Sequence, residues 1–169
     1  MRKILKIIIL FLINHFLCGN RLWKTKCFLL KFAGIKIGKN VKVVGPIKID
    51  TCLTLTIGDE CWIGRNFQVI GNDNVKIGNN CDIAPDVIFE TGTHLIGSTN
   101  RRAGEGYCMP INIGDGSWIG VRATILPGVH IENGCVIAAG AVVTKSISKN
   151  CLVGGVPAKI LKKLTEEGR

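Results

Sequence analysis

Residues 113–148 read IGDGSW-IGVRAT-ILPGVH-IENGCV-IAAGAV-VTKSIS, six consecutive hexads that each begin with Ile or Val. A period of six residues matches neither the 3.6-residue period of a helix nor the two-residue alternation of a single strand. It fits a coil with three flat sides and three tight corners, in which the leading aliphatic residue points inward. The fifth residue also points inward, close to a corner, and is mostly small: Ser117, Ala123, Val129, Cys135, Ala141 and Ile147. Three hexads then complete one coil, and successive coils stack at roughly 4.8 Å.

The same pattern recurs towards the N-terminus. Comparable hexads open at Ile37, Ile57, Ile63, Ile77 and Ile83. Gly, Asn and Asp occupy the predicted corners, where tight turns often require a positive φ angle. We therefore predict one all-β domain over residues 35–156, a parallel β-helix shaped as a triangular prism.

The first 34 residues differ in composition and are predicted to be helical. Residues 1–49 contain no Asp or Glu but eleven Lys and Arg, a balance that favours an anionic partner. Residues 4–18 are apolar but are shorter than the roughly 20 residues of a membrane span, and no clean signal-peptide cleavage site follows them. Residues 21–32 mix Leu, Trp and Phe with Lys and Arg, as helices in a membrane interface do. We expect residues 1–32 to contact a membrane surface, to cap the first coil, or both, and we expect no nucleic-acid partner.

The C-terminal segment and the cysteines complete this outline. Pro157 suits the first turn of a helix, so residues 157–169 are predicted to form a short C-terminal helix and a tail. The eight cysteines are scattered, without a CxxC pair or a Cys/His cluster of zinc spacing. We interpret them as reduced core residues of a cytoplasmic protein, with no metal site.

His94 is the strongest candidate for chemistry. It ends the hexad FETGTH where the repeat breaks, and the next clear hexad begins at Ile113. The intervening residues 95–110 form a long insertion, and long loops in compact repeat proteins are usually functional. A histidine beside such a loop suits general-base catalysis because its usual pKa is near neutral. His15 lies in the apolar N-terminal run and His130 ends a regular hexad, so neither is expected to be catalytic.

These motifs resemble those of the hexapeptide-repeat acyltransferases over roughly residues 35–164, and especially the sugar, maltose and galactoside O-acetyltransferases and those of polysaccharide biosynthesis. The resemblance implies a left-handed β-helix and a homotrimer. TGTHL matches the segment that carries the catalytic histidine in those enzymes, so His94 would remove the proton of an acceptor hydroxyl that attacks acetyl-CoA directly. A backbone N–H near Gly120 is a candidate oxyanion donor. Glu90 or Asp86 could orient the imidazole, but the favoured interpretation is that both are solvated residues of the coil.

The same resemblance implies further site residues. The segments WIGVRATILPGVHI, VIAAGAVVTKSI and VGGVPAKIL match the CoA-binding end of the family. Carried over by position, the cofactor contacts are Gly120, Ala139, Thr144, Lys145, Lys159 and Lys162. The substrate contacts are Asn66 and either Asn72 or Asp73. Arg101 and Arg102 are expected either to clamp an anionic sugar or phosphate or to form a solvated loop tip.

The predicted function is O-acetylation of a sugar hydroxyl with acetyl-CoA, in the synthesis of surface polysaccharide or lipopolysaccharide. The predicted location is the cytoplasm, either free or peripheral at the inner face of the membrane. A second hypothesis keeps the chemistry but makes the acceptor serine, or an antibiotic of the streptogramin or chloramphenicol type. Two hypotheses of other classes are a γ-type carbonic anhydrase, which needs three histidines around zinc, and a non-catalytic β-helix protein.

Overall fold

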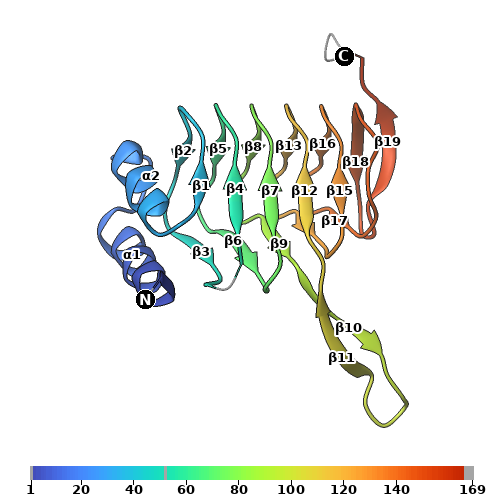
Figure 1. Cartoon of the computed structure of the whole chain (residues 1–169). Helices are drawn as coiled ribbons and strands as arrows, with labels where there is room; N and C mark the ends of the chain where they lie inside the picture. The colour runs from blue at the N-terminus through green and yellow to red at the C-terminus, as the bar shows by residue number, and fades with distance from the viewer. Residues whose placement is uncertain (1, 52, 166–169) are drawn as a thin grey trace.

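The computed structural model describes residues 2–51 and 53–165 (Figure 1). Short parallel strands stack into three sheets, which form the three faces of a β-helix. The first face holds β1 (Lys36–Ile37), β4 (Leu55–Ile57), β7 (Val75–Ile77), β12 (Ile111–Ile113) and β15 (His130–Ile131). The second holds β2 (Lys42–Val43), β5 (Trp62–Ile63), β8 (Asp82–Ile83), β13 (Trp118–Ile119), β16 (Val136–Ile137) and β18 (Cys151–Gly154). The third holds β3 (Ile47–Ile49), β6 (Phe67–Ile70), β9 (Ile88–Glu90), β14 (Thr124–Ile125) and β17 (Val142–Val143).

The interior of the prism confirms the predicted use of the hexad. The leading aliphatic residues are buried, and so are all six of the fifth-position side chains from Ser117 to Ile147. Cys61, Cys81, Cys135 and Cys151 are buried as free thiols among them, as predicted. The prediction is wrong for Cys18, which is exposed, and Cys27 and Cys108 are only half-buried, whereas Cys52 lies outside the described residues. In the third face the rings of Phe67 and Phe89 pack edge to face, with centroids 5.1 Å apart. Apolar burial along the whole axis therefore holds the coils in register.

The corner that joins the first face to the second explains why Asp or Asn follows Gly in many hexads. The Asp59 carboxylate accepts a hydrogen bond from the Lys39 N–H at 2.7 Å, and the Asn79 side-chain oxygen accepts one from the Asp59 N–H at 2.8 Å. Asp115 continues the ladder by accepting from the Asn79 N–H at 2.7 Å. Each short polar side chain thus satisfies an N–H of the preceding coil. At Gly58 a Cβ would lie only 2.6 Å from backbone atoms of Gly78, so the close stacking of coils requires glycine there.

Two helices, α1 (Arg2–Phe16) and α2 (Trp23–Phe32), lie at the N-terminal end of the prism, as the sequence predicts (Figure 1). α1 contacts β3, and α2 contacts β1 and β2, so both helices cover the first coil. Asn14 fixes α1 to the edge strand, because its amide donates to the Ile47 carbonyl at 2.8 Å and accepts from the Ile47 N–H at 2.9 Å. Neither helix has the length and apolarity needed to cross a bilayer.

The predicted C-terminal helix is wrong. Residues 159–163 form β19 (Lys159–Lys163), a strand that pairs antiparallel with β18 and turns the chain back along the second face. β18 is the last strand of that face and would otherwise expose a row of unpaired backbone groups. Pairing with β19 satisfies them, whereas a helix of seven residues would gain few internal hydrogen bonds.

The insertion in the repeat is a β-hairpin rather than an irregular loop. β10 (Gly92–Ile96) and β11 (Ala103–Cys108) pair antiparallel between β9 and β12 and project away from the prism (Figure 1). The hairpin leaves from the corner that joins the third face to the first, which we call the third corner. The corner that joins the second face to the third is called the second corner.

Candidate active site

His94 lies in β10, at the base of the hairpin. Its cross-strand partner is Gly106, and the side chain is exposed. The imidazole Nδ1 lies 2.9 Å from the carbonyl oxygen of Gly104. Since a carbonyl can only accept, this contact requires a proton on Nδ1. In the neutral ring Nε2 is then unprotonated and free to act as a base, which is the tautomer that general-base catalysis needs.

A pocket of about 490 Å³ surrounds this histidine. It is bounded by the turn after β6 on one side and by the base of the hairpin on the other. The lining residues are Gly71, Asn72, Glu90, Gly92, Thr93, His94, Gly106, Tyr107 and Cys108. Its walls therefore offer an imidazole, a carboxylate, an amide, hydroxyls and one aromatic ring, which are groups that suit a polyhydroxylated ligand.

The floor of the pocket is held by hydrogen bonds to the backbone. Thr91 is fully buried, and its hydroxyl donates to the Ile70 carbonyl at 3.0 Å while accepting from the Asp73 N–H at 3.3 Å. The Glu90 carboxylate accepts from the Gly92 N–H at 2.9 Å. These bonds tie the turn after β6 to the start of β10, so the two walls of the pocket are fixed relative to each other.

Glu90 and Asp86, the two candidates for orienting the imidazole, are bonded to other groups. Glu90 lines the pocket, but its recorded hydrogen bond is to the Gly92 N–H, and Asp86 accepts from the Asn66 amide at 2.8 Å and lies 4.0 Å from Arg122. The group that orients the imidazole is therefore the Gly104 carbonyl. The N–H of Gly120 is also not a free oxyanion donor, because it donates to the Ile137 carbonyl of the next coil at 2.8 Å.

The predicted substrate residues divide into two groups. Asn72 lines the His94 pocket, and Asp73 follows it with its N–H bonded to Thr91. Asn66 lies at the second corner, at the other end of β6, in a separate pocket with Gln68 and Asp86. Arg101 and Arg102 lie at the exposed tip of the hairpin, where the Arg102 guanidinium donates to the Gly97 carbonyl at 3.2 Å. Of the predicted substrate residues, Asn72 in the turn after β6 is therefore the one that lines the same pocket as His94 within a single chain.

The predicted cofactor residues occupy two corners and the C-terminal strand. Gly120 and Ala139 follow β13 and β16 at the second corner, whereas Thr144 and Lys145 follow β17 at the third corner, on the same edge as His94. Lys159 and Lys162 are exposed on β19. Among the described residues the recorded ion pair is Arg122 with Asp86, so these lysines have no acidic partner there.

Sequence reasoning missed Tyr107 and Gly106 of the pocket and the carbonyl of Gly104. The available signal was the Gly-rich stretch AGEGY, which indicates close backbone approach when it is read as a strand. A Cβ on Gly106 would lie 3.3 Å from Cε1 and 3.5 Å from Nδ1 of His94. Glycine at this position leaves room for the imidazole.

Replacing Gly106 by alanine is expected to lower turnover about tenfold with CoA affinity unchanged, because the added methyl group displaces the imidazole by a few tenths of an ångström. Steady-state kinetics together with CoA titration would measure both quantities. Ile96→Ala is the control, since Ile96 lies further out on the same hairpin and is 89% exposed. Equal kinetics for Gly106→Ala and the wild type would contradict a role for His94 in its present position.

Across residues 2–51 and 53–165, no three His, Cys, Asp or Glu side chains lie close enough together to ligate one metal ion. His94 and His130 are on different elements, the hairpin and β15.

Comparison with known proteins places this geometry in a family. Residues 110–145 match the model described as the hexapeptide repeat of succinyl-transferase. The chain is 33% identical over 141 residues to galactoside O-acetyltransferase of Escherichia coli (strain K12), covering 83% of this chain and 70% of that one. It is 32% identical over 145 residues to WcaF of the same organism, whose name describes a colanic acid biosynthesis acetyltransferase, covering 86% of this chain and 78% of that one.

The solved structures agree. A galactoside acetyltransferase in complex with coenzyme A superposes with a TM-score of 0.85 at 28% identity, covering 98% of this chain and 82% of that chain. The chain is shorter than some relatives. It spans 65% of a Saccharomyces cerevisiae protein named as an acetyltransferase, to which it is 38% identical over 128 residues, or 76% of this chain. The stacked hexads, the hairpin with its histidine and these similarities together show that the chain belongs to the hexapeptide-repeat acetyltransferase family.

Proposed function

We propose that the chain transfers an acetyl group from acetyl-CoA to a sugar hydroxyl, with His94 as the general base. The observation that carries this proposal is the imidazole in the pocket, with Nδ1 bonded to the Gly104 carbonyl and Nε2 left as the base. The relatives named galactoside O-acetyltransferase and the neighbour solved with coenzyme A support the reaction class.

The proposed reaction is one direct transfer. Nε2 of His94 takes the proton of the acceptor hydroxyl as its oxygen attacks the thioester carbonyl, which forms a tetrahedral oxyanion. The C–S bond then breaks, the acetyl ester forms, and the imidazolium returns its proton to the sulfur of CoA. The Gly104 carbonyl keeps the ring in one tautomer and stabilises the imidazolium as it forms.

The lining of the pocket favours a neutral sugar. Glu90 is its one carboxylate, and no Lys or Arg lines it. Glu90, Asn72 and Thr93 offer hydrogen-bonding atoms to hydroxyls, and the exposed ring of Tyr107 offers an apolar face to a pyranose. The similarity to WcaF supports a place for this reaction in the synthesis of surface polysaccharide or lipopolysaccharide.

The arrangement of the corners favours a homotrimer with sites between subunits. His94 lies at the third corner, whereas Gly120 and Ala139 lie at the second, across a face of about six residues. Six extended residues span up to ~20 Å, too far for one acetyl-CoA thioester to meet both. If two prisms pack with the second corner of one beside the third corner of the next, a groove forms in which both sets reach one cofactor. The exposed Lys145, Lys159 and Lys162 would then meet its phosphates.

We place the protein in the cytoplasm, where acetyl-CoA is made and where thiols stay reduced. Seven cysteines lie among the described residues, and all seven are free thiols, in keeping with that location.

The test is release of CoA thiol from acetyl-CoA in the presence of galactosides, maltose, serine or chloramphenicol, with succinyl-CoA as a second donor. We expect turnover with acetyl-CoA and a neutral glycoside, and an ester product that hydroxylamine cleaves. Turnover with serine or chloramphenicol, but with no sugar, would show that the acceptor is not a sugar and would contradict that part of the proposal. The absence of thiol release with every acceptor, together with tight CoA binding, would overturn it.

A further inference from the structure

α1 leaves large apolar side chains exposed on the side that faces away from the prism. Its exposed large apolar residues are Ile4, Ile7, Ile8, Phe11, Leu12 and Phe16, with exposed fractions between 39% and 72%. Its inward side carries Lys6, whose ammonium donates to the carbonyls of Asp50 and Leu53 at 3.0 and 3.2 Å, and Asn14, which is bonded to Ile47. Ile9 and Ile13 are also buried on the inward side, but a helix that only capped the prism would carry mostly polar residues on its outer side.

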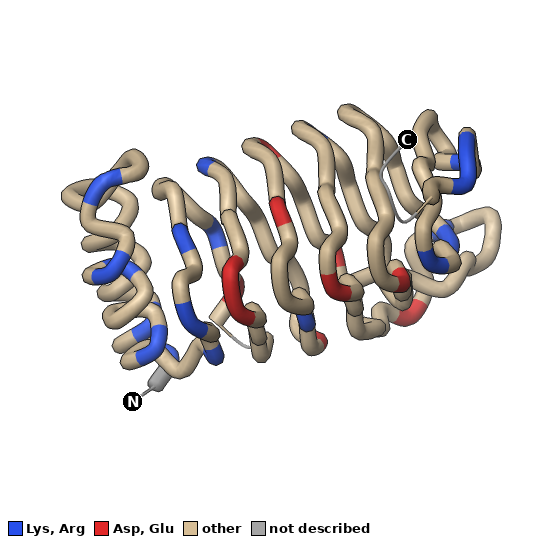
Figure 2. The backbone as a smooth tube through the Cα atoms, turned by 90° about the horizontal axis from the view of Figure 1, so that it is seen from above, with Lys and Arg blue, Asp and Glu red and all other residues tan. Residues whose placement is uncertain are grey.

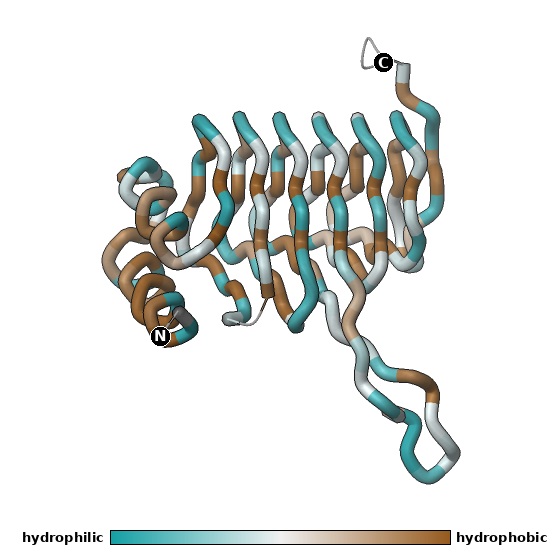
Figure 3. Tube along the Cα trace, in the orientation of Figure 1, coloured by the Kyte–Doolittle hydropathy of each residue, from teal (hydrophilic) through white to brown (hydrophobic). Residues whose placement is uncertain are grey.

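The exposed apolar residues of α1 form one continuous stripe. Their spacings of three and four residues place them on the same face of a helix. From Ile4 to Phe16 the stripe is about 18 Å long. Figure 3 shows the same apolar character along α1, in contrast with the polar turns of the prism. Soluble monomers rarely leave so long an apolar strip uncovered, so this face has a partner.

α2 extends the surface and adds positive charge. Leu22, Phe28 and Phe32 are each at least 60% exposed, and Lys24 and Lys31 are exposed between them. No acidic residue occurs before Asp50. Figure 2 accordingly shows blue segments and no red on the two helices, whereas red begins within the coils. A face of large apolar groups interleaved with cations complements the acyl chains and anionic headgroups of a lipid surface.

We propose that the exposed faces of α1 and α2 bind the surface of a membrane that contains anionic lipid. The helices lie in the interface, with the Ile, Leu and Phe side chains among the acyl chains and Lys24 and Lys31 at the phosphates. This arrangement agrees with the finding that neither helix can cross a bilayer. The inward Lys6 and Asn14 hold α1 on the prism while its outer face enters the lipid.

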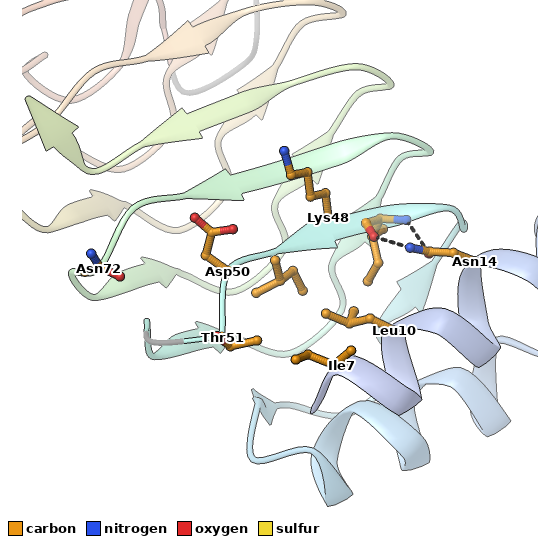
Figure 4. Close-up of a pocket in the computed structure, with 9 residues that line it drawn as sticks. Ile7, Leu10, Asn14, Lys48, Asp50, Thr51 and Asn72 are labelled. Carbon is orange, nitrogen blue, oxygen red and sulfur yellow. Dashed lines mark hydrogen bonds between the residues drawn. The ribbon is translucent and has the colours of Figure 1, made fainter. Parts of the chain in front are cut away.

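The surface also connects with the catalytic pocket. A second pocket of about 420 Å³ lies between α1 and β3, lined by Ile7, Leu10, Asp50 and Asn72, among others (Figure 4). Asn72 lines both this pocket and the His94 pocket, and Ile7 belongs to the exposed stripe. A membrane bound at α1 would therefore lie beside the acceptor site.

The test is flotation of the full chain with vesicles. One vesicle preparation contains phosphatidylcholine and phosphatidylglycerol, and the other contains phosphatidylcholine alone. We expect binding to the mixed vesicles that weakens with added salt, and weaker binding to the neutral ones. The double variants Ile8→Ser/Phe11→Ser and Lys24→Gln/Lys31→Gln should each lower the partition at least about tenfold.

The control is Ile160→Ser/Leu161→Ser, which removes two equally exposed apolar side chains at the other end of the prism, on β19, and should float like the wild type. Circular dichroism and light scattering would verify the fold and the mass of each variant. Absence of flotation with mixed vesicles, or unchanged flotation of the helix variants, would overturn the proposal. A loss of subunit association in Ile8→Ser/Phe11→Ser would also overturn it, because the stripe would then be a contact between copies. Vesicle binding is measured without substrates, so its failure is distinct from failure of acetyl transfer.

Discussion

Replacing His94 by alanine is expected to lower acetyl-CoA turnover by about 10²–10⁴-fold, the usual contribution of a general base. CoA affinity should stay unchanged, because the predicted cofactor residues lie on other elements of the chain. Thiol-release kinetics and CoA titration would measure the two quantities.

His130→Ala is the matched control for this experiment. His130 is also an exposed histidine, but it lies on the outer wall of β15 and outside the His94 pocket. Its replacement should leave turnover within about twofold of the wild type, since surface substitutions away from special features usually have small effects. Retained turnover in His94→Ala would contradict the mechanism, and equal losses in both variants would show that histidine replacement acts through the fold instead.

Phe89→Ala is expected to have the largest effect on stability. The ring is fully buried in the third face and packs edge to face on Phe67 at 5.1 Å. Truncating a buried Phe to Ala costs about 3–5 kcal/mol, through lost burial and the cavity that remains. Small domains unfold with only about 5–15 kcal/mol, so the loss is a large share of the total. Urea unfolding followed by circular dichroism would measure it.

Trp118→Ala is the control for this prediction, because the Trp118 side chain is 55% exposed on the outer wall of β13. Its loss should change the free energy of unfolding far less than the loss of Phe89. Comparable losses for the two variants would mean that the interior of the prism does not carry the stability. β9 also leads directly into the site corner, so Phe89→Ala should lower activity along with stability.

Much of the fold could be predicted because each coil repeats the same pattern of inward aliphatic residues and polar or glycine corners. The six-residue period defines which side chains are inward, and the buried series from Ser117 to Ile147 confirms it. The Asp and Asn after glycine in the hexads were correctly assigned to corners, although their bonding between coils became visible only in three dimensions. His94 could be singled out because it stands where the period breaks.

The C-terminal strand and the partner of the imidazole could not be predicted, for one physical reason. Residues 159–163 favour no structure strongly by themselves, and the unpaired edge of β18 decides that they become a strand. The Gly104 carbonyl likewise reaches His94 only because the hairpin pairs β10 with β11 in a particular register. In both cases the deciding contact involves backbone groups. Every residue carries these groups, so the amino-acid sequence gives no sign of which of them will pair.

The same distinction applies to the N-terminal helices. The sequence by itself determined that the first 34 residues are basic and rich in apolar residues, that helices occur among them, and that the following chain is a coil of period six. Only the tertiary structure decided which side of α1 faces the prism. Lys6 points inward because its ammonium donates to the carbonyls of Asp50 and Leu53. Asn14 points inward because its amide bonds to both backbone groups of Ile47. Because those polar groups are satisfied at the first coil, α1 packs inward through them and through Ile9 and Ile13, and Ile4, Ile8 and Phe11 are left on the outside.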